Sequence, residues 1–186
     1  MTNEDAEVLK RWQALPRRVY LDTSTLQTLY DFSGEVFEGK PFAPSGRAGR
    51  VVGFGADLES LRRIFHVNER AQFEFVVTQA SLREVDGRGR PGYSQWVRDV
   101  LDTWLIQSEA DDPPDQVDVL DQPKFGHLSQ KDLALLRDAL GYRCDGFLTM
   151  ERKLYTAAPF IQRATGLRLL RPPSYWDLIQ PWAALY

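Results

Sequence analysis

Short apolar runs alternate with longer stretches of helical character along most of the chain, and this alternation is the feature that most constrains the fold. The helical stretches carry apolar residues at helical spacing, and four short runs between them are typical of β-strands. Strands are expected at residues 17–21, 73–77, 146–149 and 167–170. Strands that alternate with helices build βαβ units. We therefore expect an α/β fold with a mainly parallel sheet covered on both faces.

The helices expected from this pattern span eight segments. They are residues 4–15, 23–30, 56–69, 78–85, 93–107, 129–140, 151–166 and 174–185. Thr23 or Ser24 is expected to cap the helix at 23–30, because hydroxyl side chains satisfy the first amide groups of a helix. Gly141 is expected to end the helix at 129–140, and Pro159 to break the one at 151–166.

Two regions lack both patterns and are expected to be loop insertions. Residues 32–55 contain glycine and proline with little periodicity, and residues 108–127 are acidic with three prolines, apart from a short strand expected at 117–120. We expect residues 1–16 to be an N-terminal helical extension and residues 17–186 to be one domain. A chain of 186 residues, 43% of them apolar, is long enough to bury one sizeable core.

Composition excludes several kinds of protein. Cys144 is the only cysteine, so an internal disulfide and a cysteine-rich zinc site are excluded, and we expect it to be a packing residue. His66 and His127 are expected to be surface or packed residues. No apolar run reaches the roughly 18 residues of a membrane helix, and no apolar signal core follows the polar N-terminus, which indicates the cytoplasm. The net charge of −3 is compatible with a nuclease, because metal-binding carboxylates themselves lower the charge.

Four acidic residues fall where the carboxyl ends of the strands are expected to meet. Asp22 directly follows the first strand, and Glu151 stands just past the third. Glu84 and Asp132 lie on the helices that start near 78 and 129. In open parallel sheets ligands bind beyond the carboxyl ends of the strands. Mg2+ and Mn2+ prefer carboxylate oxygens, and a bound ion polarises a phosphate and activates water. The pattern predicts a metal site for phosphodiester hydrolysis.

Each of these acids also has a structural interpretation. Asp132 stands three residues after Ser129 and fits a capping box, a role compatible with metal binding. Asp22 fits a helix cap, Glu84 a solvent-facing position, and Glu151 a first-turn acid favoured by the helix dipole. Together the four acids support a metal site more strongly than any one of them alone, because all of them fall on one predicted edge of the sheet.

Five segments, in order along the chain, resemble the motifs of PIN-domain ribonucleases. VYLDTSTL (19–26) resembles the opening strand, which ends in Asp with Ser or Thr two residues on, and VVTQASLREV (76–85) resembles a strand and a helix bearing Glu. LSQKDLALLRDAL (128–140) resembles a helix with Asp near its start, and CDGFLTMERKLY (144–155) a strand ending in Thr-x-acid and a basic residue. LRLLRPPSYWDLI (167–179) is similar to the closing strand, proline and helix.

This resemblance implies a PIN-like three-layer αβα sandwich and an endoribonuclease that depends on Mg2+ or Mn2+. The implied metal-site acids are Asp22, Glu84, Asp132 and Glu151, with Ser24 and Thr149 as supporting polar residues. The fourth acid is commonly Asp in the family, so the extra methylene of Glu151 shifts that carboxylate by about one bond length. Asp145 is the reserve candidate for this position, although it is expected at the opposite end of its strand.

Basic and aromatic residues near the acids are expected to hold the substrate. Those expected to contact RNA phosphates are Arg83, Arg88, Arg90, Lys131, Arg152 and Lys153. The alternative is that they form an ordinary solvated face. Tyr93 and Trp96 are candidates for stacking on bases, with core packing as the alternative for Trp96.

The resemblance also bears on partners, because the family includes toxins of toxin–antitoxin pairs that often dimerise. It implies an RNA substrate, an antitoxin or other protein partner, and a homodimer. The two insertions make the chain longer than compact toxins, so an RNA-processing or defence nuclease is equally compatible. Two other functions stay open: a catalytically inert PIN-like module that binds RNA or protein, favoured by Glu151 in place of Asp, and a structure-specific DNA nuclease.

Overall fold

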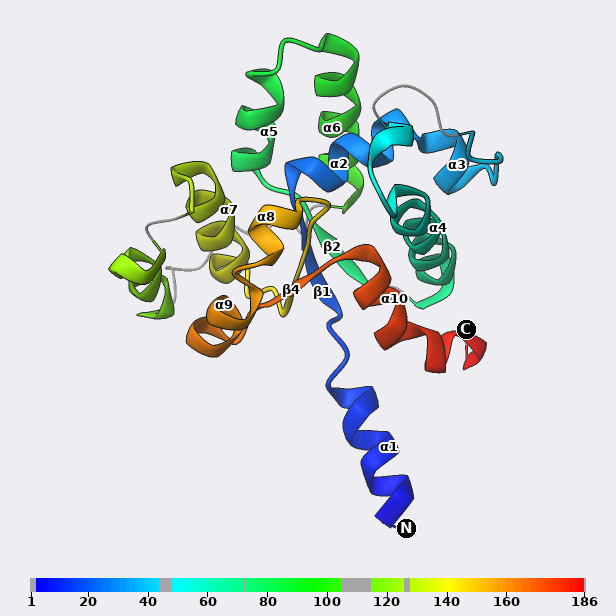
Figure 1. Ribbon diagram of the computed structural model, residues 1–186, viewed down its shortest axis with the longest axis vertical. Coiled ribbons are helices and arrows are strands. Elements are labelled where there is room, and N and C mark those ends of the chain that lie inside the picture. Colours follow the sequence, from blue (N-terminus) through cyan, green and yellow to red (C-terminus); the bar gives the residue numbers. More distant parts are fainter. Residues whose placement is uncertain (1–2, 44–47, 72, 105–114, 126–127, 186) are drawn as a thin grey trace.

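The computed structural model describes residues 3–43, 48–71, 73–104, 115–125 and 128–185. Within these residues one all-parallel sheet has the strand order β2-β1-β3-β4 (Figure 1). The strands are β1 (Arg18–Leu21), β2 (Glu74–Val76), β3 (Gly146–Leu148) and β4 (Arg168–Leu170). Each lies inside a range expected from the sequence. The prediction of an α/β fold with a parallel sheet is confirmed.

The strand order places a switch point beside β1. In the register Tyr20 of β1 lies between Val76 of β2 and Phe147 of β3. The chain leaves β1 for β2 on one side and later returns to β3 on the other. In open parallel sheets of this kind ligands bind beyond the carboxyl ends of the strands at such a switch point, which here lies between β1 and β3.

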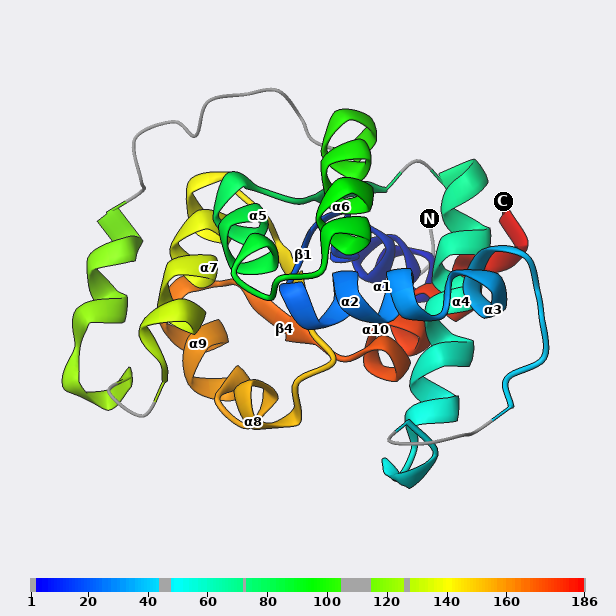
Figure 2. The ribbon, with the colours of Figure 1, turned by 90° about the horizontal axis from the view of Figure 1, so that it is seen from above.

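One face of the sheet contributes Val19, Leu21, Phe75 and Leu148 to a buried core. Five helices supply most of the rest of that core (Figures 1 and 2). They are α2 (Thr23–Asp31), α3 (Ser33–Phe37), α4 (Phe54–Ala71), α6 (Pro91–Trp104) and α10 (Pro172–Ile179), with Val85 added from α5 (Gln79–Asp86).

The intervening strand residues Tyr20, Val76 and Phe147 enter a second core on the opposite face. The elements around it are α7 (Gln130–Gly141), α8 (Arg152–Tyr155), α9 (Ala158–Thr165) and the 3-10 helix η2 (Asp115–Asp121). Because successive strand residues point to opposite faces, two cores separated by one sheet are compatible with a three-layer αβα sandwich. Cys144 lies in this second core, where burial raises the pKa of its thiol to about 12, so its predicted packing role is confirmed.

Several predicted element boundaries were wrong. The expected loop at 32–55 contains α3 and the 3-10 helix η1 (Ala48–Arg50), because Val36 of α3 is buried in the core. The strand expected at 117–120 is part of η2, where Leu120 is buried against the second core. The described part of the 108–127 insertion also holds a short 3-10 helix, η3 (Pro123–Phe125), while 105–114 and 126–127 lie outside the described residues.

Two helix ends also differ from expectation. α7 includes Gly141 and ends at the cap residue Tyr142. The break expected at Pro159 falls earlier, between α8 and α9, and Pro159 lies in the first turn of α9. Proline is tolerated there because a first-turn amide has no partner within the helix.

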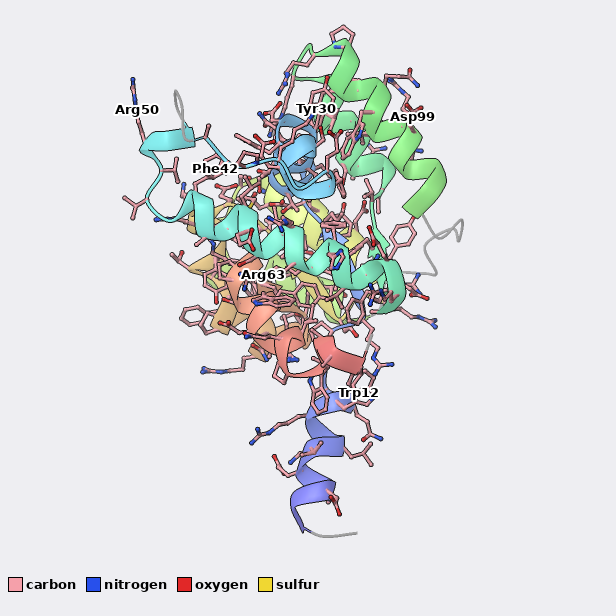
Figure 3. The ribbon with its side chains drawn as sticks, turned by 90° about the vertical axis from the view of Figure 1, so that its right-hand side faces the viewer. Trp12, Tyr30, Phe42, Arg50, Arg63 and Asp99 are labelled. Carbon is pink, nitrogen blue, oxygen red and sulfur yellow. The ribbon has the colours of Figure 1, made fainter. Side chains whose placement is uncertain are left out.

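The helix α1 (Asn3–Gln13) projects from the layered body and contacts it near its own C-terminal end (Figures 1 and 3). The rings of Trp12 and Trp182 meet edge-on at 5.2 Å, and the guanidinium of Arg17 lies 4.6 Å from the Trp12 ring. Arg168 donates to the carbonyl of Ala14 at 2.6 Å. No helix among the described residues is both long and apolar enough to cross a bilayer.

A buried chain of hydroxyl groups links three of the elements that surround the carboxyl ends of the strands. The Tyr20 hydroxyl lies 2.8 Å from Thr78 Oγ1 and 3.0 Å from Ser81 Oγ, and Thr78 donates to the carboxylate of Asp138 on α7. Because each hydroxyl has one proton, Ser81 must donate to Tyr20 and Tyr20 to Thr78. The chain of bonds ties β1 to the start of α5 and to α7.

We expect Tyr20→Phe to lower the free energy of unfolding by about 1–3 kcal/mol, because it removes one partner each from two buried hydroxyls. Urea denaturation followed by circular dichroism measures the change. Tyr155→Phe is the control, since within the described part of the chain its half-buried hydroxyl contacts only Ser174, at 3.4 Å. Its expected change is below about 0.5 kcal/mol, and equal losses in the two variants would contradict the role given to Tyr20.

Candidate metal and nucleic-acid site

Asp22 is the first residue after β1 and is only 3% exposed. Its backbone is extended, and its carboxylate accepts a hydrogen bond from the Thr25 amide at 2.7 Å, so Asp22 is the N-cap of α2. The prediction that Thr23 or Ser24 caps this helix was wrong, because the helix begins one residue earlier than such a cap requires. The structural interpretation of Asp22 as a cap is confirmed.

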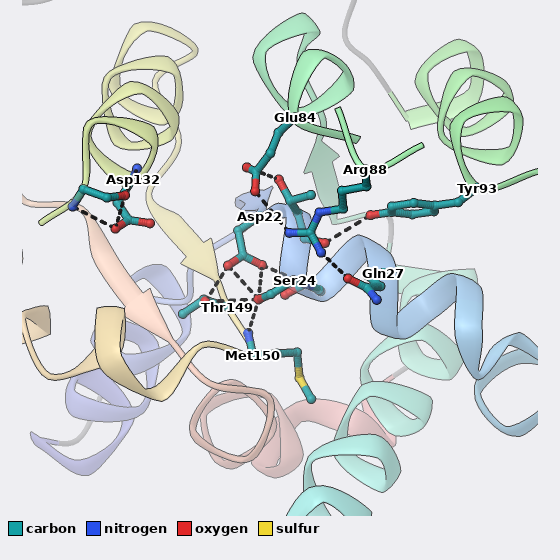
Figure 4. Close-up of polar contacts among 12 residues, drawn as sticks. Asp22, Ser24, Gln27, Glu84, Arg88, Tyr93, Asp132, Thr149 and Met150 are labelled. Atoms are coloured by element: carbon teal, nitrogen blue, oxygen red, sulfur yellow. Dashed lines mark hydrogen bonds and ion pairs between the residues drawn. The ribbon is translucent and has the colours of Figure 1, made fainter. Parts of the chain in front are cut away.

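Two hydroxyl groups join Asp22 to the turn after β3. Ser24 donates to the Asp22 carboxylate at 2.8 Å and accepts from the Met150 amide at 3.0 Å. Thr149 donates to Asp22 at 2.5 Å and accepts from the Glu151 amide at 2.9 Å. Figure 4 shows this arrangement around Asp22. The backbone that carries Glu151 is therefore fixed to Asp22 through the two residues predicted to have a supporting role.

Glu84, on α5, is turned toward α2. One of its oxygens accepts from the Thr23 hydroxyl at 2.7 Å, and the other lies 3.1 Å from the Arg88 guanidinium, which also donates to Gln27 (Figure 4). The backbone carbonyl of Thr23 accepts from the Tyr93 hydroxyl at 3.1 Å. From the sequence Thr23 was expected only as a helix cap, and Gln27 was not singled out. The run of hydroxyl residues in the first turn of α2 was the available signal for Thr23.

Asp132 is engaged at the start of its own helix. Its Oδ2 accepts from the amide of Ser129 at 3.1 Å and from the hydroxyl of Ser129 at 2.7 Å, which completes the predicted capping box. Figure 4 shows it apart from Asp22 and Glu84. Within the part of the chain that the structure describes, no three His, Cys, Asp or Glu side chains are grouped closely enough to hold a metal ion.

The four acids nevertheless share one electrostatic environment. Burial raises the pKa of Glu151, and the charges of Asp132, Asp22 and Glu84 raise it further, against an opposing contribution from Lys153. Burial also raises the pKa of Asp22, although the hydrogen bonds from Thr149 and Thr25 oppose the shift. Both effects disfavour the ionised carboxylates.

The donor chemistry at this edge fits a hard divalent cation. The candidate ligands are oxygen atoms only, from four carboxylates and the two hydroxyls beside Asp22. A divalent ion would offset the cost of a buried negative charge on Asp22 and the repulsion between Glu151 and the neighbouring carboxylates. Mg2+ commonly keeps several water ligands and takes only one or two carboxylates directly. The separation of the side chains is therefore compatible with an ion that contacts most of them through water.

Three of the predicted RNA contacts lie together. Arg83, Arg88 and Lys131 line a cavity of about 570 Å³ between α5 and α7, and Glu84 borders the same cavity. Figure 2 shows these two helices side by side. The cavity thus joins a basic rim to one of the candidate metal ligands.

The other three basic residues have different surroundings. Arg90 pairs with Asp31 at 2.6 Å and lies over the rings of Tyr30 and Tyr93. Arg152 donates to the carbonyl of Val52 in the 32–55 insertion. The charge of Lys153 acts on Glu151. Arg90 and Arg152 therefore have protein partners, and the assignment of all three residues to RNA stays a prediction.

Other candidates lie away from the site. Asp145 accepts from the amides of Arg17 and Arg18 at 3.1 and 2.9 Å, at the amino end of β1, so it cannot replace Glu151. Tyr93 is fully buried, and its predicted stacking on bases was wrong. Trp96 packs against the core that contains Val19 and Leu21, and its ring centre lies 5.8 Å from that of Tyr30. His66 is exposed, as expected, while His127 lies outside the described residues.

Comparisons with known proteins add no assignment to this picture. No family model matches the chain, and neither curated proteins nor solved structures give a match. The function has to be argued from the geometry of the site and from the motifs of the sequence.

The raised pKa of Asp22 predicts how stability depends on pH. The folded protein holds the Asp22 proton more tightly than the unfolded chain does, where the pKa has its ordinary value of 3.8. The contribution of Asp22 to the free energy of unfolding therefore falls as the pH rises above that value. In EDTA, Asp22→Asn is expected to flatten the fall in unfolding free energy between pH 4 and 7 and to be more stable than the wild type at pH 7. Urea denaturation across this range measures both.

Asp86→Asn is the control for this measurement. Asp86 forms an exposed ion pair with Arg98 at 3.0 Å, away from the buried carboxylate. It should keep the pH slope of the wild type. A slope that Asp22→Asn leaves unchanged would contradict the burial argument.

Proposed function

We propose that this chain is a PIN-like endoribonuclease that depends on Mg2+ or Mn2+, with its active site at the carboxyl ends of β1 and β3. The observation that carries the proposal is the buried carboxylate of Asp22 at the switch point of the sheet, held by two hydroxyls that also fix the Glu151 turn. Buried acids whose charge is disfavoured by burial and by one another are typical of functional sites.

In this proposal Asp22 would ligate the ion directly. Glu84 and Glu151 would complete the site, and Asp132 would contribute from the start of α7. Ser24 and Thr149 hold Asp22 in place. When bound, the ion polarises the scissile phosphate and lowers the pKa of a water molecule so that hydroxide can attack near neutral pH.

The proposed path of the RNA runs along the cavity between α5 and α7. Arg83 and Lys131 on its rim are suited to phosphate oxygens, which receive most side-chain contacts in nucleic-acid complexes. The choice of RNA rests on the resemblance of the motifs, because carboxylates do not distinguish ribose from deoxyribose. Parallel assays on RNA and DNA oligomers test this choice and the alternative of a DNA nuclease.

A catalytically inert PIN-like module that binds RNA or protein is the second candidate. It is favoured by the capping role of Asp132 and by the wide spacing of the acids in the described residues. Glu151, at a position where the family commonly has Asp, also favours the inert module. An antitoxin as partner, a homodimer and a cytoplasmic location remain parts of the proposal that the neighbouring reading frame, solution mass and localisation would test.

Asp22→Asn is expected to lower Mn2+-dependent cleavage of a fluorescent RNA oligomer by more than about 100-fold, since even residues behind the ligands typically contribute 10–100-fold. EDTA should abolish the wild-type activity. Asp86→Asn should cleave at the wild-type rate. Full activity of Asp22→Asn, or cleavage that resists EDTA, would contradict the nuclease proposal, and RNA binding without Mn2+ binding would support the inert module.

Thr149→Val removes a donor to Asp22 and an acceptor for the Glu151 amide while keeping the shape of the side chain. We expect cleavage to fall by about 10–100-fold, with a higher Mn2+ concentration needed for half-maximal rate. Thr156→Val is the matched control, because among the described residues the exposed Thr156 hydroxyl bonds only to the nearby Lys153 carbonyl. Unchanged Mn2+ dependence in Thr149→Val would remove Thr149 from the site.

A further inference from the structure

Arg88 bridges two elements of the candidate site. Its guanidinium lies 3.1 Å from Glu84 on α5 and donates to the Gln27 side chain on α2. Figure 4 shows the guanidinium between these two side chains, close to Asp22 and Ser24 in the view. A positive charge supplied by the protein itself thus lies against one of the proposed metal ligands.

Both oxygens of Glu84 are engaged in this arrangement. Oε2 accepts from the Thr23 hydroxyl at 2.7 Å, and Oε1 faces Arg88. A metal ion that takes Glu84 as a ligand therefore competes with the guanidinium for the same carboxylate. The Arg88 side chain is 37% exposed, and ion pairs with this much solvent contact are weak enough to exchange partners readily.

The alternative partner for Arg88 is close by. Arg88 lines the cavity between α5 and α7 together with Arg83 and Lys131, the same cavity that Glu84 borders. A guanidinium released from a carboxylate presents paired N–H groups that match two phosphate oxygens. A phosphate in this cavity would therefore replace the lost partner with one of the same charge sign.

We propose that Arg88 is an internal counter-ion of the acid site, which neutralises Glu84 while the metal is absent and binds an RNA phosphate once a divalent ion has displaced it. The inference rests on the proposed function and deepens it. It makes Arg88 a residue whose removal helps the metal and harms the substrate, a combination that a purely structural residue would not produce.

Arg63 on α4 provides a matched control. It has the same charge, its side chain is 50% exposed, and it pairs with Glu59 at 2.8 Å over the same spacing of four residues as Arg88 and Glu84. Both members of this control pair lie on α4, and neither is a candidate ligand of the site. Replacing Arg63 removes a positive charge of the same kind without changing the partner of Glu84.

The experiment compares the wild type with Arg88→Gln and Arg63→Gln, after thermal melting has shown that all three are folded. Calorimetric titration with Mn2+ in the absence of RNA should show about two- to five-fold tighter binding for Arg88→Gln, the equivalent of one half-exposed ion pair. At saturating Mn2+, the KM for an RNA oligomer should rise several-fold while kcat changes less. The logarithmic salt dependence of KM should become shallower by about one. Arg63→Gln should match the wild type in both measurements.

The Mn2+ titration and the RNA cleavage assay together separate failure of this inference from failure of the proposed function. If the wild type binds Mn2+ and cleaves RNA but Arg88→Gln binds the ion no more tightly, the role of Arg88 is overturned and the nuclease survives. Equal effects of the two glutamine variants would also overturn it, because a general loss of positive surface charge would then explain the result. If the wild type binds no Mn2+, the proposed function and this inference fall together.

Discussion

The buried carboxylate of Asp22 is the constraint on which the rest of the site depends. Placing an ionisable group in the interior is costly unless hydrogen-bond donors surround it, and here the donors are the amide of Thr25 and the hydroxyls of Ser24 and Thr149. Two of the three also hold the backbone beyond β3. The same interaction therefore closes the first turn of α2, joins the ends of two neighbouring strands and sets the position of Glu151.

Two of the remaining acids, Glu84 and Asp132, depend on helix packing. Glu84 lies on α5 and Asp132 on α7. The hydrogen bonds through the Tyr20 and Thr78 hydroxyls tie both helices to β1, on the face of the sheet that borders the second core. Asp22 and Glu151 follow directly from the ends of β1 and β3, while helices place Glu84 and Asp132 through side-chain contacts. This division explains why one carboxylate is rigidly held and the others are spread around it.

Residues at the strand ends could be predicted from the sequence. Short apolar runs located all four strands, so Asp22 was placed correctly just beyond β1. Thr149, expected as the last residue of its strand, lies one residue beyond β3. Residues set by distant contacts were harder. Gln27 and Arg88 are 61 positions apart, and no local pattern connects them. The aromatic ring of Tyr93 suggested stacking on bases, but a buried bond to the Thr23 carbonyl determines its place.

The capping box of α7 has a consequence for how tightly an ion could be shared among the acids. Asp132 uses Oδ2 to hold the amide and hydroxyl of Ser129, at the end of the helix where the backbone dipole is positive. Part of its negative charge already balances that dipole. A cation drawn toward Asp132 would meet the partial positive charge of the helix end. The acids would therefore contribute unequally to the affinity for a divalent ion. The buried Asp22 would contribute most, and Asp132 less.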